Sequence, residues 1–179
     1  MITVLSGTNR PASRTRRFAD HFADLLAHLG QPAQLLDLTD VPAAYFTTTM
    51  YEAAAVHPEL RRLQQRYVLE ADKLAIFVPE YNGSYPGVLK LFVDGISVND
   101  YAENFRDKRV ALVGVSSGRA GNLRGVDHLS DVIAHMGGWV LPNRLPISGV
   151  HDLLAADGRL TDAATEDALR QLARQLIAA

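Results

Sequence analysis

The chain has 179 residues, of which 47% are hydrophobic and 21% are charged, an ordinary balance for a globular protein that can bury a sizeable core. The net charge is −2 and the isoelectric point about 6.3, so the composition gives no support for a general affinity for nucleic acid. Because the chain contains no cysteine, disulfides, thiolate metal sites and cysteine nucleophiles are excluded, and a reducing compartment is consistent with this composition.

The amino-terminal segment predicts a strand and not a targeting signal. Ile2–Leu5 is a strand-like run and the sequence turns polar at Ser6, which leaves no room for a signal peptide. No apolar stretch approaches the roughly 18 residues needed to span a bilayer. The chain also shows no repeat, low-complexity segment or interdomain linker, so we expect one cytoplasmic domain that covers residues 1–179.

The opening of the chain has the pattern of a βαβ unit. Ile2–Leu5 is short, β-branched and apolar, as is typical of a parallel strand buried on both faces. The helix predicted next has apolar residues at spacings of three or four, namely Phe18, Phe22, Leu25, Leu26 and Leu29. Ser13 is its expected N-cap and Gly30 its expected end. A second strand at Gln34–Leu38 completes a pattern that favours a doubly wound parallel sheet.

The segment Thr39–His57 is long for a connection in a compact domain, and such segments often form lids or contain small elements of their own. Its largest side chains are Tyr45, Phe46, Met50 and Tyr51. These side chains fit two interpretations equally well: they wall a ligand pocket, or they pack locally under the loop. A helix from Pro58 to about Asp72 is predicted after this segment.

Leu74–Val78 predicts the third strand, and Pro86 is well placed to start the helix that follows. The apolar residues of this helix are Val88, Leu89, Leu91, Phe92, Val93 and Ile96. They occupy more than one face, so the helix needs cover on two sides. A subunit interface and burial within the monomer both satisfy this requirement.

The remaining sequence predicts two further strand–helix units. Arg109–Val115 has the pattern of a fourth buried strand and is followed by a helix that extends to Met136. A short fifth strand is predicted at Trp139–Pro142, with its tryptophan in the core, and a last helix starts at about Asp162 with Thr161 as its cap. Five such units predict a parallel sheet with helices on both faces.

Three loops at strand ends contain the residues that suggest chemistry. The first loop, Ser6–Thr15, places Arg10, Ser13 and Thr15 near the start of the first helix. Three more arginines follow in the first helical turn: Arg14, Arg16 and Arg17. Cations at a helix N-terminus are unfavourable unless an anion lies nearby, so the loop predicts a phosphate site, whereas solvated arginines are the alternative. The loop matches neither the Walker A nor the G-x-G-x-x-G pattern, so a single phosphate fits best.

The second loop, Pro79–Pro86, follows the third strand. An Asn-Gly pair at Asn82 allows positive φ angles and leaves backbone N–H and C=O groups facing outward. These groups are suited to a flat heterocycle with donors and acceptors at its edge, while Tyr81 or Tyr85 covers its face. Glu80 either orients the loop or is a solvated charge, and a purely structural turn is the alternative for the loop as a whole.

The third loop, Ser116–Gly125, follows the fourth strand, and its glycines Gly118 and Gly121 allow the backbone to approach a ligand closely. Taken alone, these glycines are weak evidence for a site. The three loops together are stronger evidence, because the carboxyl ends of the first, third and fourth strands would meet at one edge of the sheet, where ligands bind in open α/β sheets.

These motifs resemble a known family. "GTNRPAS" followed by Thr15, then "PEYNGSYPGVLK", then "SSGRAG" is similar to the flavodoxin-like NAD(P)H-dependent FMN reductases, which include quinone, azo-dye and chromate reductases. Thr8 stands where serine is usual and Thr15 where asparagine is usual, and both keep a hydrogen-bonding side chain. Asn122 stands where a second glycine is common. The order and spacing of the elements match the family over most of the chain.

The resemblance implies a flavodoxin-like three-layer fold with five parallel strands in the order 2-1-3-4-5. It also implies an FMN cofactor, with its phosphate against Thr8, Arg10, Ser13 and Thr15. The remaining cofactor-binding residues that it implies are Pro79, Glu80, Tyr81, Asn82, Ser84, Ser116, Ser117 and Gly118. Because the flavin supplies the chemistry in such enzymes, no catalytic acid or base is expected. No metal site is expected either, because the six histidines show no i, i+4 pair and no H-E-x-x-H motif.

The activity that the resemblance implies is a ping-pong transfer of hydride from NADPH or NADH through FMN to a small acceptor, such as a flavin, a quinone, an azo compound or a metal oxyanion. Homodimers or homotetramers are common in the family, and the over-apolar helix after Pro86 would form the interface. An electron carrier of the flavodoxin type, or a flavin-binding module without turnover, is the main alternative. A serine hydrolase is a remote one, because Gly114–Gly118 matches G-x-S-x-G around Ser116, with Asp127 or Asp131 and a later histidine to complete a triad.

Overall fold

Six parallel strands form a single sheet in the computed structural model, which describes residues 1–179. The strands are β1 (Ile2–Ser6), β2 (Ala33–Asp37), β3 (Lys73–Pro79), β4 (Arg109–Val115), β5 (Trp139–Val140) and β6 (Leu145–Ile147). Their order is β2-β1-β3-β4-β5, which confirms the predicted arrangement of the five expected strands, and β6 pairs with the carboxyl-terminal half of β4. The chain passes from β1 outward to β2 and then back across to β3, which creates a switch point in the strand order between β1 and β3.

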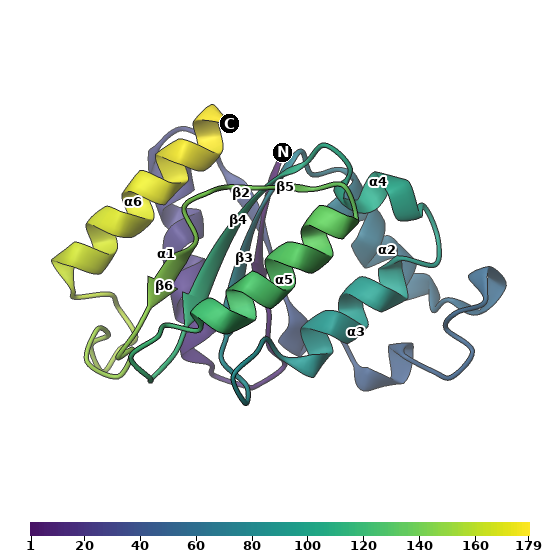
Figure 1. The fold of residues 1–179 in the computed structure, drawn as a ribbon, viewed down its shortest axis with the longest axis horizontal. Helices are drawn as coiled ribbons and strands as arrows, with labels where there is room; N and C mark the ends of the chain where they lie inside the picture. The colour runs from purple at the N-terminus through teal and green to yellow at the C-terminus, as the bar shows by residue number, and fades with distance from the viewer.

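Helices cover both faces of the sheet (Figure 1). One face is covered by α1 (Arg14–His28) and α6 (Ala163–Ala178). The other face is covered by α2 (Pro58–Gln64), α3 (Gly87–Ile96), α4 (Tyr101–Phe105) and α5 (Leu123–His135). Each layer of helices buries its own apolar cluster against the sheet. Phe18 and Phe22 of α1 belong to one cluster together with Phe77 of β3, and Phe92 of α3 belongs to the other. None of these helices combines the length and the apolar character that crossing a membrane would require.

The local signals of α1 act as the sequence predicts. The Ser13 hydroxyl accepts a hydrogen bond from the backbone N–H of Arg16 at 3.2 Å and so caps the helix. Phe18 and Phe22 are completely buried, one turn apart on the face toward the sheet. The helix ends before Gly30, whose φ of +80° is accessible to glycine at little steric cost.

Two helix ends differ in detail from the prediction. The helix from Pro58 passes at Gln65 into a π-helical segment, η4 (Gln65–Leu69), and ends three residues before Asp72. The last helix is capped by Asp162 and not by Thr161, because the Asp162 carboxylate accepts the Thr165 N–H at 2.8 Å. The short helix α4 was not predicted, since five residues are too few to show a periodic pattern.

The fifth strand differs from the prediction in both extent and burial. Trp139–Val140 pairs only with the start of β4, and Leu145–Ile147 forms the separate strand β6 farther along the same neighbour. Trp139 lies at the sheet edge with 60% of its surface exposed, so its expected place in the core is wrong. Its ring instead lies 5.1 Å from the Arg109 guanidinium, a cation–π contact on the surface.

The segment 39–57 contains short 3₁₀ turns and packs beside α3. These turns are η1 (Leu38–Asp40), η2 (Ala43–Tyr45) and η3 (Ala53–Ala55). Met50 is buried, Tyr45 stacks on His57 with ring centroids 4.0 Å apart, and Phe46 packs over Gly95 of α3. Tyr51 remains exposed. Tyr45 therefore packs within the segment, whereas Phe46 connects the segment to α3.

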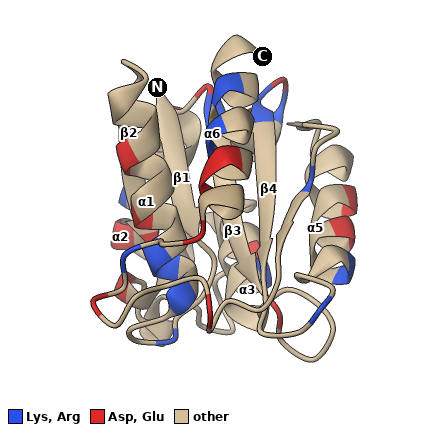
Figure 2. Ribbon diagram, turned by 90° about the vertical axis from the view of Figure 1, so that its left-hand side faces the viewer, with Lys and Arg blue, Asp and Glu red and all other residues tan.

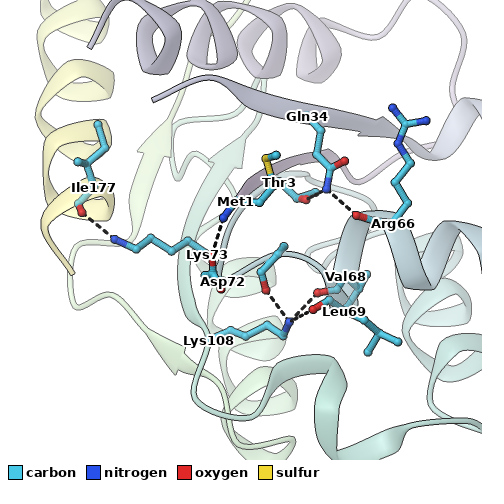
Figure 3. A network of polar contacts seen from close by, with 11 residues as sticks. Met1, Thr3, Gln34, Arg66, Val68, Leu69, Asp72, Lys73, Lys108 and Ile177 are labelled. Atoms are coloured by element: carbon cyan, nitrogen blue, oxygen red, sulfur yellow. Dashed lines mark hydrogen bonds and ion pairs between the residues drawn. The ribbon is translucent and has the colours of Figure 1, made fainter. Parts of the chain in front are cut away.

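The amino ends of the strands are joined by a network of polar contacts (Figure 3). The Met1 ammonium group pairs with Asp72, and the Lys73 ammonium group donates to the carbonyl of Ile177 in α6 at 2.7 Å. Lys108, just before β4, extends its side chain under the end of η4. This network ties α6, η4 and the sheet together at the edge opposite the three loops.

Lys108 donates to three carbonyl groups at and just beyond the end of the helix. Its ammonium nitrogen donates to the carbonyls of Val68 at 2.6 Å, Leu69 at 3.1 Å and Ala71 at 2.5 Å. The residue is buried, and this burial lowers the pKa of the Lys108 ammonium group. A lysine is suited to the position because it has three donors and a positive charge at the negative end of a helix.

Replacing this lysine should destabilise the fold. We expect Lys108→Met to lower the free energy of unfolding by about 2–3 kcal/mol, because the apolar side chain fills the space but removes the donor to the Leu69 and Ala71 carbonyls. Urea denaturation measures the change. Lys90→Met is the matched control, since Lys90 forms only an exposed pair with Asp94 in α3, and we expect it to cost less than about 1 kcal/mol. Equal costs for the two variants would show that the helix end does not depend on Lys108.

Candidate functional site

The carboxyl ends of β1, β3, β4 and β6 surround one cavity of about 630 Å³. This volume falls in the range of roughly 300–1,000 Å³ that is usual for small-molecule sites. Of the predicted site residues, only Ser84 does not line the cavity. Those that do are Thr8, Arg10, Ser13, Thr15, Pro79, Glu80, Tyr81, Asn82, Ser116, Ser117 and Gly118. The three loops singled out in the sequence therefore meet at one place.

The loop after β1 passes closely over β3. The Gly7 N–H donates to the Phe77 carbonyl at 2.9 Å, and a Cβ atom on Gly7 would lie 2.8 Å from that same oxygen. Only glycine fits this position without moving the backbone. The next residue, Thr8, is buried, and its hydroxyl accepts the Arg10 N–H at 3.2 Å and shares a hydrogen bond of 2.7 Å with the Tyr81 hydroxyl. The β1 loop is thus bonded to the β3 loop.

The start of α1 presents groups suited to an anion. Basic residues gather at this end of the helix (Figure 2). Arg10 and Arg14 line the cavity, and no acidic side chain forms an ion pair with either of them. Thr15 is buried beside the cavity, and its hydroxyl forms no hydrogen bond with the rest of the chain. Unpaired cations, a free hydroxyl and the N–H groups of the first helical turn together favour phosphate.

The other two arginines of this turn have structural contacts. Arg16 donates to Asp20 at 2.7 Å and to the buried Asp37 at the end of β2 at 2.8 Å. Burial acts to lower the pKa of Arg16, but its hydrogen bonds to the two aspartates raise it overall. Arg17 lies along Gly158, where a Cβ atom would be 3.0 Å from its Nε. Of the three arginines within the helix, only Arg14 therefore faces the cavity.

The loop after β3 forms a miniature hairpin. Tyr81 and Ser84 exchange backbone hydrogen bonds of 2.9 and 3.1 Å across the two residues between them. Asn82 and Gly83 have φ angles of +53° and +77°, the combination found in a type I′ turn. Asn-Gly is the preferred pair for this turn, so the sequence fixes the shape of the loop that enters the cavity.

Ser84 and Tyr85 point away from the cavity. The Ser84 hydroxyl is hydrogen-bonded to Nδ1 of His128 in α5 at 2.9 Å. Tyr85 packs against the apolar cluster under α3, and burial raises the pKa of its hydroxyl. Of the two tyrosines considered from the sequence, Tyr81 is the one that lines the cavity.

The amino end of α5 supports the hairpin. Asn122 adopts a φ of +61°, accepts the Gly125 N–H through its Oδ1 at 3.2 Å, and donates through Nδ2 to the Val78 carbonyl at 2.9 Å. Asparagine tolerates this left-handed conformation better than most residues, which explains how it occupies a position where glycine is common. A Cβ atom on Gly125 would lie 2.7 Å from the Ser84 carbonyl carbon, so the helix and the hairpin are in direct contact.

The loop after β4 is bonded to the β3 loop through a side chain. Ser116 is buried, and its hydroxyl donates to the Glu80 carboxylate at 2.7 Å and accepts the Gly118 N–H at 3.0 Å. The remaining wall comes from Val150 and His151, which follow β6 and were not predicted as site residues. The apolar run Leu145–Ile147 is the signal that could have revealed β6 and hence this wall.

This geometry does not assemble a serine hydrolase. The Ser116 hydroxyl is bound by a carboxylate, and no histidine forms a hydrogen bond with it. Asp127, one of the two candidate triad acids, instead pairs with Arg144 at 2.7 Å. A nucleophilic serine needs a histidine base within hydrogen-bond reach, and that partner is missing from the contacts of Ser116.

Solved structures with the same architecture place the chain in the flavodoxin-like class. It superimposes on a flavodoxin from Streptococcus pneumoniae with a TM-score of 0.60 at 20% identity, over 99% of this chain and 96% of that one. A higher TM-score, 0.81, is found with FerB, a flavoenzyme NAD(P)H:(acceptor) oxidoreductase from Paracoccus denitrificans, at 25% identity over 99% of this chain and 94% of that chain.

Residues 1–152 match the model of the NADPH-dependent FMN reductase family, and the chain belongs to this family. It is 31% identical over 153 residues to an NAD(P)H-dependent FMN reductase of Pseudomonas aeruginosa, which covers 84% of this chain and 77% of the relative. It is also 31% identical over 135 residues to a 2-hydroxy-1,4-benzoquinone reductase of a Burkholderia species, which covers 75% of this chain and 70% of the relative. The chain is therefore an oxidoreductase of the NAD(P)H-dependent FMN and quinone reductase type.

Proposed function

We propose that the cavity binds FMN and that the chain uses it to pass reducing equivalents from NADPH or NADH to a small electron acceptor. The observation that supports this most directly is the pairing of two features in one cavity. Arg10 and Arg14 form a cationic end without acidic partners, and the Tyr81–Ser84 hairpin forms a polar, rigid end. A molecule with a phosphate at one end and a flat, polar-edged ring at the other fits both.

In the proposed mode, the phosphate is bound at the start of α1. The buried hydroxyl of Thr15, the Ser13 hydroxyl and the N–H groups of the first turn supply hydrogen bonds, while Arg10 and Arg14 supply charge. Thr8 contributes indirectly, because its hydroxyl is already engaged by Tyr81 and by the Arg10 N–H. It holds the loop in the shape that the phosphate needs.

The ring would be bound between the β3 and β4 loops. Pro79–Asn82 provides backbone groups on one side, and Ser116–Gly118 provides them on the other. FMN held there would supply the redox chemistry, namely hydride transfer from the reduced nicotinamide and then reduction of the acceptor at the same place, which is a ping-pong scheme. The chain's own residues bind and orient the two substrates in turn, and no side chain is assigned as a catalytic acid or base.

The acceptor is proposed as a class. Relatives of this chain include a reductase named for a benzoquinone and an NADPH azoreductase from a Bacillus species, which is 26% identical over 161 residues. We therefore propose a small, flat or oxyanionic acceptor: a free flavin, a quinone, an azo compound or a metal oxyanion. An electron carrier of the flavodoxin type is the competing function, and the near-neutral net charge of −2 disfavours it because carriers are typically strongly acidic around the flavin.

The proposed function is tested by cofactor binding followed by reduction. We expect the purified protein to bind FMN with one site per chain, measured by quenching of flavin fluorescence. Under anaerobic conditions, NADPH or NADH should bleach the visible absorbance of bound flavin within seconds, and an added quinone should restore it. Failure to bind FMN would exclude the proposal. Binding without bleaching by either nucleotide would instead support the electron carrier.

The phosphate site is tested by arginine substitutions. We expect Arg10→Gln and Arg14→Gln each to weaken FMN binding about tenfold, since each removes one charge-assisted contact to phosphate. Riboflavin, which lacks the phosphate, should bind these variants and the wild type equally. Arg17→Gln is the matched control, because Arg17 belongs to the same turn but lies along Gly158 outside the cavity. If Arg17→Gln weakened FMN binding as much, a general charge effect would explain the results.

We further propose that the chain forms a homodimer or homotetramer through α3. Support comes from the partly exposed apolar residues Val88 and Leu91 and from a cavity of about 470 Å³ between α3 and α5, whose walls include Val93, Val132 and Met136. Light scattering would contradict this proposal if it gave the monomer mass of 19.6 kDa at micromolar concentration.

A further inference from the structure

Glu80 differs from every other residue around the cavity because it is the only acidic side chain in the lining. No lysine, arginine or histidine forms an ion pair with it. Its position is fixed by the backbone, since the Glu80 N–H donates to the Val115 carbonyl at 3.1 Å and so extends the pairing of β3 and β4 by one residue. Glu80 is exposed to solvent, but its carboxylate also accepts a hydrogen bond from a buried side chain.

The hydrogen bond that the Glu80 carboxylate accepts connects it to the loop after β4. Glu80 Oε2 receives the Ser116 hydroxyl proton at 2.7 Å, and the Ser116 oxygen in turn receives the Gly118 N–H at 3.0 Å. Gly118 is in contact with both partners, because a Cβ atom on it would lie 3.4 Å from Ser116 Oγ and 3.9 Å from Glu80 Oε2. The chain Glu80–Ser116–Gly118 thus runs from the β3 loop to the β4 loop.

We propose that Glu80 is a positioning residue of the cofactor site, which acts through Ser116 to hold the Ser116–Gly118 loop against the hairpin. This inference rests on the proposed function, in which that loop contacts one side of the flavin ring. It assigns Glu80 an indirect role: the carboxylate orients the serine hydroxyl, and the hydroxyl orients the Gly118 amide, so the loop is preorganised before the ligand arrives.

The Ser116 backbone is bonded to Ile147 and Val150, so the contact with Glu80 matters for the two residues beyond it. Ser117 and Gly118 are exposed, and glycine gives the backbone wide conformational freedom. On the opposite side of the hairpin, the hydrogen bond between Tyr81 and Thr8 performs the corresponding task for the β1 loop. Glu80 and Tyr81 are adjacent in the β3 loop. The Glu80 side chain therefore bonds this loop to the β4 loop, and the Tyr81 side chain bonds it to the β1 loop.

A double-mutant cycle separates an indirect role from direct contact with the flavin. We expect Glu80→Ala and Ser116→Ala each to raise the dissociation constant for FMN about tenfold, which corresponds to the loss of one charge-assisted hydrogen bond. The double variant should bind no more weakly than either single variant, because both substitutions break the same chain of bonds. Additive losses, about a hundredfold in the double variant, would overturn the proposal and assign Glu80 a separate contact.

Glu80→Gln provides the conservative rescue. The amide oxygen of glutamine still accepts the Ser116 proton, so we expect FMN binding within about threefold of the wild type. Glu103→Ala, at an exposed position of α4 near the other edge of the sheet, is the control for loss of a surface carboxylate and should leave FMN binding unchanged. If Glu80→Gln weakened binding as much as Glu80→Ala, the charge itself would matter and the positioning role would be overturned.

Hydrogen exchange in the protein without FMN tests the same contact independently of cofactor binding. We expect the Gly118 amide to exchange about tenfold faster in Glu80→Ala and Ser116→Ala than in the wild type or in Glu80→Gln. Unchanged exchange in both alanine variants would overturn the inference while leaving the proposed function intact. A wild-type protein that binds no FMN, but whose Gly118 amide responds as expected, would overturn the proposed function and keep the link between Glu80 and the loop.

Discussion

The register of β1, β3 and β4 is the constraint on which the site depends. These strands are parallel neighbours, so their carboxyl ends lie at the same edge of the sheet and three loops leave it side by side. Beyond the last ladder bond, the loops must satisfy their polar groups through one another or through a ligand. Tyr81 bonds to Thr8 on one side and Glu80 to Ser116 on the other, while the outward-facing groups of the hairpin remain free for a ligand.

The amino edge of the sheet contributes polar contacts to stability, and the carboxyl edge contains the polar groups that are available for binding. At the amino edge, Lys108 is fully engaged by three carbonyls and the Met1 amine by Asp72, so little polar capacity remains for a ligand. At the carboxyl edge, Arg10, Arg14 and the Thr15 hydroxyl have no such partners. An interaction that would stabilise the empty site would also compete with the ligand, so these groups are useful for binding because the fold leaves them unpaired.

Local signals made most of the fold and the centre of the site predictable. Asn-Gly favours a type I′ turn, Ser13 caps a helix through its own hydroxyl, and β1, β3 and β4 are nearly continuous apolar runs. Predictions failed where a residue's role depends on distant partners. Nothing near Arg16 in the sequence reveals Asp37, nothing near Trp139 reveals that its strand is only two residues long, and the end of η4 depends on Lys108 some forty residues later. His151 was missed because the strand that positions it, β6, has only three residues.

The distribution of charge in the cavity also gives the ligand a direction. Arg10 and Arg14 lie at the start of α1, whereas the single carboxylate, Glu80, lies between the β3 and β4 loops. A phosphate is attracted to the first position by the arginines and the helix N-terminus and is repelled from the second by Glu80. A neutral ring pays no such electrostatic cost near Glu80, whose hydrogen bond is already directed at Ser116. In the proposed mode, the same side chain therefore holds the loop that contacts the ring and disfavours a phosphate beside that loop.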